Sequence, residues 1–176
     1  MSHKKIVYQT LENRGTHLRE LEANGPYPCN WENSWLGDGY YFWDTFIENA
    51  HWWGDKVRKF SKGYIICEAT CYFNDSECLD LHGNLEQLKQ FKEAFTLAKK
   101  NKLVDDNTTI KNFLAKLRGE LESFQKYTAI RINAIKSKNY TSIYSINLLF
   151  EKDRNQFMEV IPAIQICFYN KNSLGL

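Results

Sequence analysis

Hydrophobic positions follow a helical period in the middle of the chain and a strand-like pattern on either side of it. In two stretches, 85–100 and 108–124, apolar side chains recur every three or four residues, which is the spacing of a helix with one buried face. The first stretch carries Leu85, Leu88, Phe91, Phe95 and Leu97, and the second carries Ile110, Phe113, Leu114, Leu117 and Leu121. The pattern predicts two amphipathic helices, which form a helical insertion at about residues 84–126.

Strands are expected wherever β-branched and aromatic residues gather into short runs before and after these helices. The runs are 5–10, 36–43, 63–73, 77–81, 128–135, 144–150 and 161–169. Two shorter helices are expected between the early strands, 16–23 with Thr16 as its cap and 44–54 with Asp44 or Thr45 as its cap, and 26–35 is expected to be a loop. Because strands and helices do not alternate strictly, we expect an α+β fold.

The size and composition of the chain agree with one domain that spans residues 1–176. The chain has 176 residues, of which 43% are hydrophobic and 15% aromatic, enough for one core and too many for disorder over the whole length. No apolar run approaches the roughly 18 residues that a membrane span needs, and the amino end lacks the apolar stretch of a signal peptide. We therefore expect a cytoplasmic protein with no membrane partner.

Charge and cysteine usage narrow the picture only slightly. The formal net charge is +2, from 23 Lys and Arg against 21 Asp and Glu, which does not by itself indicate nucleic-acid binding. A connector at 99–107 carries basic and then acidic clusters, and we interpret it as a solvated loop, with a basic binding patch as the alternative. The five cysteines are odd in number, so we expect reduced thiols.

A zinc site is one interpretation of the spacing among four potential ligands: Cys67, Cys71, Cys78 and His82. Cys67 and Cys71, however, lie four residues apart in a run of strand character. Residues at that spacing share a face of the sheet but are too far apart for one zinc ion. We therefore expect no metal site.

The most informative segment is 35–54, where glycines and aromatic residues concentrate. One interpretation is that the aromatics fill a core and the glycines make a turn. Alternation along a strand, however, directs Tyr40 and Phe42 to one face of a sheet and Tyr41 and Trp43 to the other. Both faces are then aromatic, and one of them can serve as a stacking surface.

Residues 37–42, Gly-Asp-Gly-Tyr-Tyr-Phe, are followed by Ala50 and Trp53. This pattern resembles the G-x-G-[IL]-Y-F…A…[YWA] signature of the ADP-ribosyltransferase fold. The likeness is to the branch of diphtheria toxin and the poly(ADP-ribose) polymerases and to its small microbial relatives, which often carry W-L-G-x-G-x-Y-F, matched here from Trp35 to Phe42. The resemblance implies a split antiparallel sheet around an NAD cleft, with the helical pair as an insertion.

The resemblance also implies which residues form the site. In that family an early strand binds the nicotinamide amide and the adenosine ribose, an aromatic strand supplies a tyrosine that stacks on nicotinamide, and a late strand supplies a glutamate. Tyr41 and Gln165 are then the catalytic positions. The residues implied to bind NAD are Tyr8, Gln9, Thr10, Gly39, Tyr40, Tyr41 and Trp43.

Gln9 stands where the family has a histidine, and Gln165 where it has the glutamate. Glutamine can hydrogen-bond a ribose hydroxyl, but it has no charge to stabilise a cationic sugar and cannot act as a base. Considered alone, Gln9 also fits a turn, Gln165 a polar position within a strand, and His51 a packing or surface residue rather than a catalytic base. Glu68 is an alternative source of the missing carboxylate.

The resemblance therefore implies an NAD-dependent ADP-ribosyltransferase, or an NAD-cleaving enzyme, with a protein or nucleic-acid acceptor. The alternative is a catalytically inactive domain of the same fold that binds a nucleotide, a nucleic acid or a protein. A third interpretation is an unrelated structural α+β domain in which the motif is a coincidence.

Overall fold

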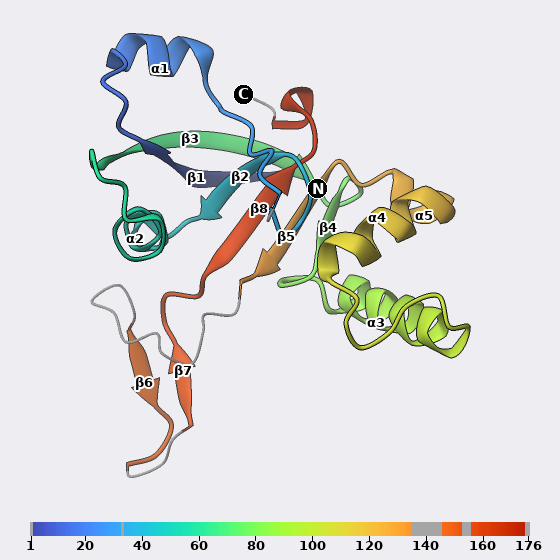
Figure 1. Cartoon of the computed structure of the whole chain (residues 1–176). Helices are drawn as coiled ribbons and strands as arrows, with labels where there is room; N and C mark the ends of the chain where they lie inside the picture. The colour runs from blue at the N-terminus through green and yellow to red at the C-terminus, as the bar shows by residue number, and fades with distance from the viewer. Residues whose placement is uncertain (1, 33, 135–145, 153–155, 175–176) are drawn as a thin grey trace.

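The computed structural model describes residues 2–32, 34–134, 146–152 and 156–174 of the chain. Its centre is a six-stranded sheet with the order β3-β1-β2-β8-β5-β4 (Figure 1). The strands are β1 (Ser2–Glu12), β2 (Tyr40–Asp44), β3 (Tyr64–Asn74), β4 (Cys78–Asp80), β5 (Ala129–Asn133) and β8 (Ile164–Phe168). β1 and β8, the first and last strands of this sheet along the chain, thus lie close together, with only β2 between them.

The β1–β2 seam is the narrowest antiparallel junction in this sheet. β1 pairs with β3 along its whole length, from Ser2 opposite Asn74 to Glu12 opposite Tyr64. With β2 it shares only two register pairs, Val7 with Asp44 and Tyr8 with Trp43. Beyond Tyr8 the two strands separate, so the sheet opens at Gln9 without losing its strand order.

The sheet differs from the expected antiparallel arrangement at one junction, because β4 and β5 are parallel. Parallel neighbours need a crossover connection, and here the chain passes through α3 (Leu85–Lys100), α4 (Ile110–Glu120) and α5 (Glu122–Gln125). The predicted helical insertion is therefore this crossover. The α+β class is confirmed.

Side-chain alternation gives the sheet two buried faces. One face packs against α3 and α4, in a cluster that includes Leu79, Ile130 and Phe113. The opposite face carries Phe42, Ile166 and Phe168 and is covered in part by the carboxyl-terminal turn η2 (Lys171–Leu174). Tyr41 and Cys167 lie on the first face, with Phe42 and Phe168 on the second, as period-two alternation requires.

A buried ion-pair cluster joins β2, β5 and β4. The Nε of Arg131 lies 2.7 Å from Oδ2 of Asp44, whose side chain is 1% exposed, and Nη1 of Arg131 lies 3.0 Å from Oδ2 of Asp80. Burial of such charges is costly unless they are paired, so each partner depends on the others. Asp44 therefore holds β2 to β5 through Arg131. It does not cap the helix that follows β2, although its position in the sequence suggests that role.

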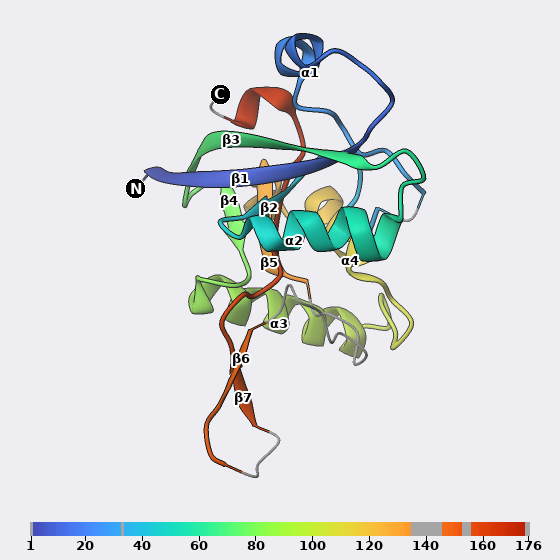
Figure 2. The same ribbon diagram turned by 90° about the vertical axis from the view of Figure 1, so that its left-hand side faces the viewer.

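The predicted ranges hold approximately for three of the helices, but the single helix expected at 108–124 is divided at Leu121, whose backbone is extended, into α4 and α5. The two predicted caps are wrong. The first short helix, α1 (Leu18–Asn24), is capped by the side chain of His17, which accepts from the N–H of Arg19, so the expected cap at Thr16 is wrong. α2 (Ile47–Trp52) begins after Phe46 with no side-chain cap and lies beside β1 and β2 (Figure 2). It continues as a π-helix, η1 (Trp53–Arg58), beyond its expected end at Gly54.

The carboxyl-terminal third contains a second, smaller sheet. β6 (Asn147–Leu149) and β7 (Phe157–Glu159) form a two-stranded sheet that extends away from the six-stranded one (Figure 1). Of the strand expected at 144–150, residues 144 and 145 lie outside the described residues. Among the helices that the structure describes, none has the length and apolar character needed to cross a membrane.

Candidate functional site

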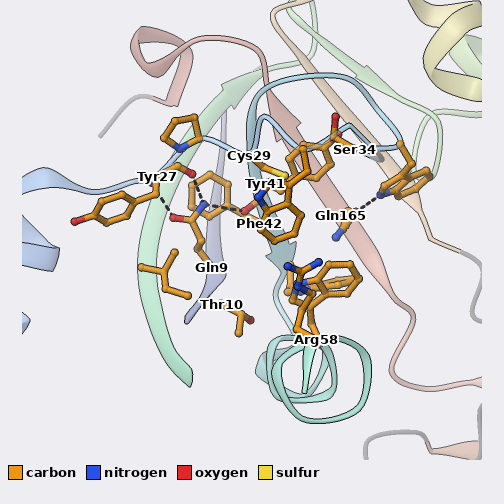
Figure 3. Close-up of a pocket in the computed structure, with 15 residues that line it drawn as sticks. Gln9, Thr10, Tyr27, Cys29, Ser34, Tyr41, Phe42, Arg58 and Gln165 are labelled. Carbon is orange, nitrogen blue, oxygen red and sulfur yellow. Dashed lines mark hydrogen bonds between the residues drawn. The ribbon is translucent and has the colours of Figure 1, made fainter. Parts of the chain in front are cut away.

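A cavity lies where β1 and β2 separate, beneath the loop that joins α1 to β2 (Figure 3). Its volume is about 140 Å³, and it opens to solvent at its mouth. Much of its wall is aromatic and comes from Tyr27, Trp31, Trp35, Tyr41, Trp43 and Trp53. The site therefore combines residues from the first strand, the loop, the aromatic strand and the helix that follows it.

The side-chain amide of Gln9 anchors the loop to the sheet. Its Nε2 donates to the carbonyls of Tyr27 (2.8 Å) and Tyr41 (3.3 Å), and its Oε1 accepts from the N–H of Tyr27 (2.9 Å). Gln9 thus replaces the backbone pairing that β1 and β2 lose at this point. Both of its donor hydrogens are used, so Gln9 shapes the cavity and has no donor left for a ligand.

Two glycines allow the loop to close over the end of β2. Gly37 has φ +97°, a conformation that side chains rarely adopt. A Cβ at Gly39 would lie 2.6 Å from the carbonyl oxygen of Phe168, and Gly39 exchanges backbone hydrogen bonds with Cys29. The G-x-G pattern is therefore required here by one backbone conformation and one close approach to β8.

The hydroxyl of Tyr41 holds the loop in place through two hydrogen bonds. It donates to the carbonyl of Gly37 (2.7 Å) and accepts from the N–H of Leu36 (2.9 Å). Burial is the main reason that the pKa of Tyr41 is raised well above its usual value. The hydroxyl is thus a neutral structural group, and Tyr41 lines the cavity as a half-buried residue.

Gln165 reaches the cavity from β8 and is 5% exposed. Its Oε1 accepts from the indole N–H of Trp35 (2.8 Å), which holds the two side chains together across 130 residues of sequence. Its Nε2 has no hydrogen-bond partner among the described residues, and Ser34, also 5% exposed, has a buried hydroxyl without a partner. Buried polar groups are nearly always paired, so the Ser34 hydroxyl indicates a place for a polar partner, and Nε2 of Gln165 is a further donor that faces the same cavity.

The cavity has a positive charge and no negative one among the described residues that line it. Arg58, the last residue of η1, is the charged residue of this set, and no aspartate or glutamate belongs to it. The guanidinium of Arg58 stacks 3.8 Å from the centre of the Trp31 ring. A negatively charged group of a ligand is therefore favoured near Arg58.

Comparisons with protein-family models, with curated proteins and with solved structures each found no match for this chain. The candidate site therefore has to be interpreted from its own geometry.

Five of the residues expected at an NAD site line this one cavity: Gln9, Thr10, Tyr41, Trp43 and Gln165. Tyr8, Gly39 and Tyr40 are not among the lining residues. Tyr8 packs with Trp43 and Ala50 in a buried cluster, Gly39 is closed off by β8, and Tyr40 points to the opposite face of the sheet. Strand alternation accounts for Tyr40, which cannot share a face with Tyr41.

The loop supplies site residues that sequence reasoning missed, namely Tyr27, Trp31, Ser34 and Trp35, and η1 adds Trp53 and Arg58. Trp35 could have been found from the sequence, because it is the first residue of the W-L-G-x-G pattern. Trp53 belongs to the expected helix and to the quoted motif. Tyr27, Trp31 and Ser34 lie in a loop without hydrophobic period, and Arg58 follows the expected end of the helix at Gly54. Only the folded loop brings them to the cavity.

The remaining candidates lie elsewhere. His51 is half-buried, with Nδ1 3.0 Å from the hydroxyl of Tyr64, in agreement with its packing interpretation. Glu68 is exposed and does not line the cavity, so it is not the missing carboxylate. No group of three or more potential ligands that could hold a metal ion occurs among the described residues. The 99–107 connector is mostly exposed, and Lys99 pairs with Asp106 there.

Proposed function

We propose that this chain binds NAD in the aromatic cavity and transfers ADP-ribose to a protein or nucleic-acid acceptor, or to water. The observation that carries the proposal is the convergence of Tyr41, Trp43 and Gln165 on one cavity at the opening between β1 and β2. These residues come from two strands that are far apart in sequence. The cytoplasmic location expected from the sequence belongs to the same proposal, since NAD is available there.

The nicotinamide ring is the part of NAD that suits the aromatic wall. A flat, electron-poor ring gains stacking energy against an aromatic side chain, and Tyr41 and Trp43, which share one face of β2, both line the cavity. Tyr41 is held in place through its hydroxyl, so little ordering of this side chain remains to be done on binding.

The ribose next to the nicotinamide suits Gln165. The free Nε2 can donate to a ribose hydroxyl oxygen while Oε1 stays bound to Trp35. The hydroxyl of Thr10 donates to the carbonyl of Ala50 (2.8 Å), so it can only accept a hydrogen bond from a ligand. Bond cleavage would then proceed by binding and desolvation of the nicotinamide end, which orients the ribose for an incoming acceptor.

Catalysis in this cavity needs a source of negative charge. Loss of nicotinamide leaves positive charge on the ribose, and no carboxylate of the described residues lines the cavity to stabilise it. An acceptor that is itself anionic, such as a carboxylate or a phosphate, would supply that charge and would need no base. We therefore place acidic acceptors first within the proposed substrate class.

The missing carboxylate also favours a second candidate function, a domain that binds NAD or a related nucleotide without turning it over. Gln9 has its donors occupied, and Gln165 offers a donor where charge stabilisation would require an anion. Both features are compatible with binding. The two candidates differ in whether nicotinamide is released.

Incubation of the full chain with NAD labelled in the nicotinamide ring separates them. We expect saturable binding and slow release of free nicotinamide, and we expect both to be lost in Tyr41→Ala. Tyr41→Phe keeps the ring and should retain binding. Tyr72→Ala, which removes an exposed tyrosine from β3 outside the cavity, is the matched control and should behave like the parent chain.

Binding without nicotinamide release would support the second candidate instead of the first. Equal binding of NAD by the parent chain and by folded Tyr41→Ala would refute the site, whichever candidate is considered. Circular dichroism of each variant shows whether its fold is retained, which matters because Tyr41→Ala also removes the hydroxyl that holds the loop.

A further inference from the structure

Arg58 lines the aromatic cavity and is itself exposed to solvent. It ends the π-helix η1, and its guanidinium stacks on the Trp31 ring at 3.8 Å and lies 5.5 Å from the centre of the Phe60 ring. π-Helical segments are uncommon and are frequent at functional sites. Here the segment extends α2 so that its last residue reaches the loop.

The hydrogen-bonding groups of Arg58 are available. The structure gives its guanidinium two ring contacts but no hydrogen bond or ion pair with any described residue. Stacking occupies the flat faces of a guanidinium and leaves its N–H groups, which lie in the plane, free to donate. These donors suit an oxygen-rich anion better than a neutral group, because they can bind two oxygens of one phosphate at once.

The surroundings add to this preference. Arg58 is the charged residue among the described lining residues, so no protein anion competes for it inside the cavity. In the view of Figure 3, Gln165 lies between Tyr41 and Arg58, with its side-chain amide nitrogen extending toward Arg58. This order corresponds to ring, ribose and phosphate along one half of a dinucleotide.

We propose that Arg58, held on Trp31, binds a phosphate of the ligand, so that the cavity selects phosphorylated nucleotides over nucleosides. The proposal rests on the proposed function for its choice of ligand. Its own content is a phosphate site made by one stacked arginine, separate from the nicotinamide site at Tyr41.

Titrations with two ligands test it. NAD carries the pyrophosphate, and nicotinamide riboside carries the same ring and ribose without phosphate. We expect Arg58→Gln to weaken NAD binding at least tenfold and to leave the affinity for nicotinamide riboside unchanged. Arg58→Lys keeps the charge but loses the planar fork, so it should recover only part of the affinity. Lys92→Gln on α3 makes the same charge change away from the cavity and should have no effect.

The outcomes separate this proposal from the proposed function. If Arg58→Gln binds NAD as tightly as the parent chain does, the phosphate site is wrong and the nicotinamide site stands. If the parent chain binds neither NAD nor nicotinamide riboside, the proposed function fails. Titration with inorganic pyrophosphate then decides the present proposal, because binding that depends on Arg58 upholds an anion site and absence of binding overturns it.

Discussion

At the scale of single residues, the two ends of the Gln165 amide perform different tasks. Oε1 holds Trp35 in the cavity wall, and Nε2 remains without a partner although the side chain is 5% exposed. An amide satisfies the first task as well as a carboxylate does. It differs in the second, because it presents a donor to the cavity where a carboxylate would present negative charge.

Gln165→Glu is therefore expected to increase nicotinamide release from NAD at least tenfold, which corresponds to about 1.4 kcal/mol of barrier. The carboxylate can still accept from the Trp35 indole, and it adds an anion beside the ribose. Gln165→Leu is the matched control, with similar size and no polar atoms, and we expect it to lower both binding and release. A folded Gln165→Glu variant that binds NAD but releases nicotinamide no faster would contradict this role.

Two buried thiols, those of Cys78 and Cys167, should make the free energy of unfolding depend on pH. Desolvation raises the pKa of Cys167 and of Cys78 from 9.0 to about 12 in the folded chain. Between pH 9 and pH 12 the folded chain keeps these thiols protonated, whereas the unfolded chain loses the protons. The thiols therefore leave the free energy of unfolding unchanged below pH 9 and lower it as the pH rises toward 12. We expect the free energy of unfolding to fall by roughly 1 kcal/mol for each thiol between pH 7 and pH 10.

Urea unfolding at pH 7, 8, 9 and 10 measures this loss. Cys167→Ala removes one of the two thiols, so its stability should depend less steeply on pH even if the variant is less stable at pH 7. A free energy of unfolding that is equally pH-dependent in the parent chain and in Cys167→Ala would exclude Cys167 as a contributor.

At the scale of elements, the cavity exists because β1 and β2 pair over only two residues and the glycine-containing loop closes the opening. Gly39 is the point where this loop meets β8, and its missing side chain permits the contact with Phe168 and Cys167. Backbone atoms of a central strand cannot move aside as a flexible side chain can. An added methyl group there must displace the loop or β8.

Gly39→Ala is expected to lower the free energy of unfolding by about 1–3 kcal/mol, the range of overpacked sites, and to weaken ligand binding with it. Gly119→Ala is the control, because a Cβ at that position in α4 meets no atom within 4 Å. It should instead stabilise the chain by up to roughly 1 kcal/mol, since alanine favours a helix more than glycine does. Thermal unfolding distinguishes the two, and a stable Gly39→Ala variant would refute the close approach.

Hydrophobic period predicted α3 and β3 well, whereas β1, expected at 5–10, extends from Ser2 to Glu12. The helix from Leu85 to Lys100 agrees with the sequence pattern at both ends, and the strand pattern of 63–73 agrees to within one residue with β3. The ends of the short elements were predicted less well. Asp44 looks like a cap by its position, but a buried arginine 87 residues away uses its carboxylate, and no local pattern reports such a partner.

At the scale of the whole molecule, the candidate site could be predicted only in part. The motif at 37–42 and strand alternation together located Tyr41 and Trp43, and the position of Gln165 on the last strand of the six-stranded sheet located the third residue. Trp31 and Arg58 could not be found in this way, because they meet only through the path of the loop and the extension of α2. The parallel β4–β5 junction likewise follows from the crossover and from no residue pattern.

We propose above that one cavity, formed where the sheet opens, holds the nicotinamide end of NAD. A crystal structure of the chain with a carbocyclic NAD analogue, whose ring cannot be cleaved from the sugar, tests it most directly. We expect the nicotinamide ring against Tyr41 and Trp43, with the neighbouring hydroxyl at Nε2 of Gln165. An analogue bound elsewhere on the chain, with this cavity unoccupied in the same crystals, would contradict it.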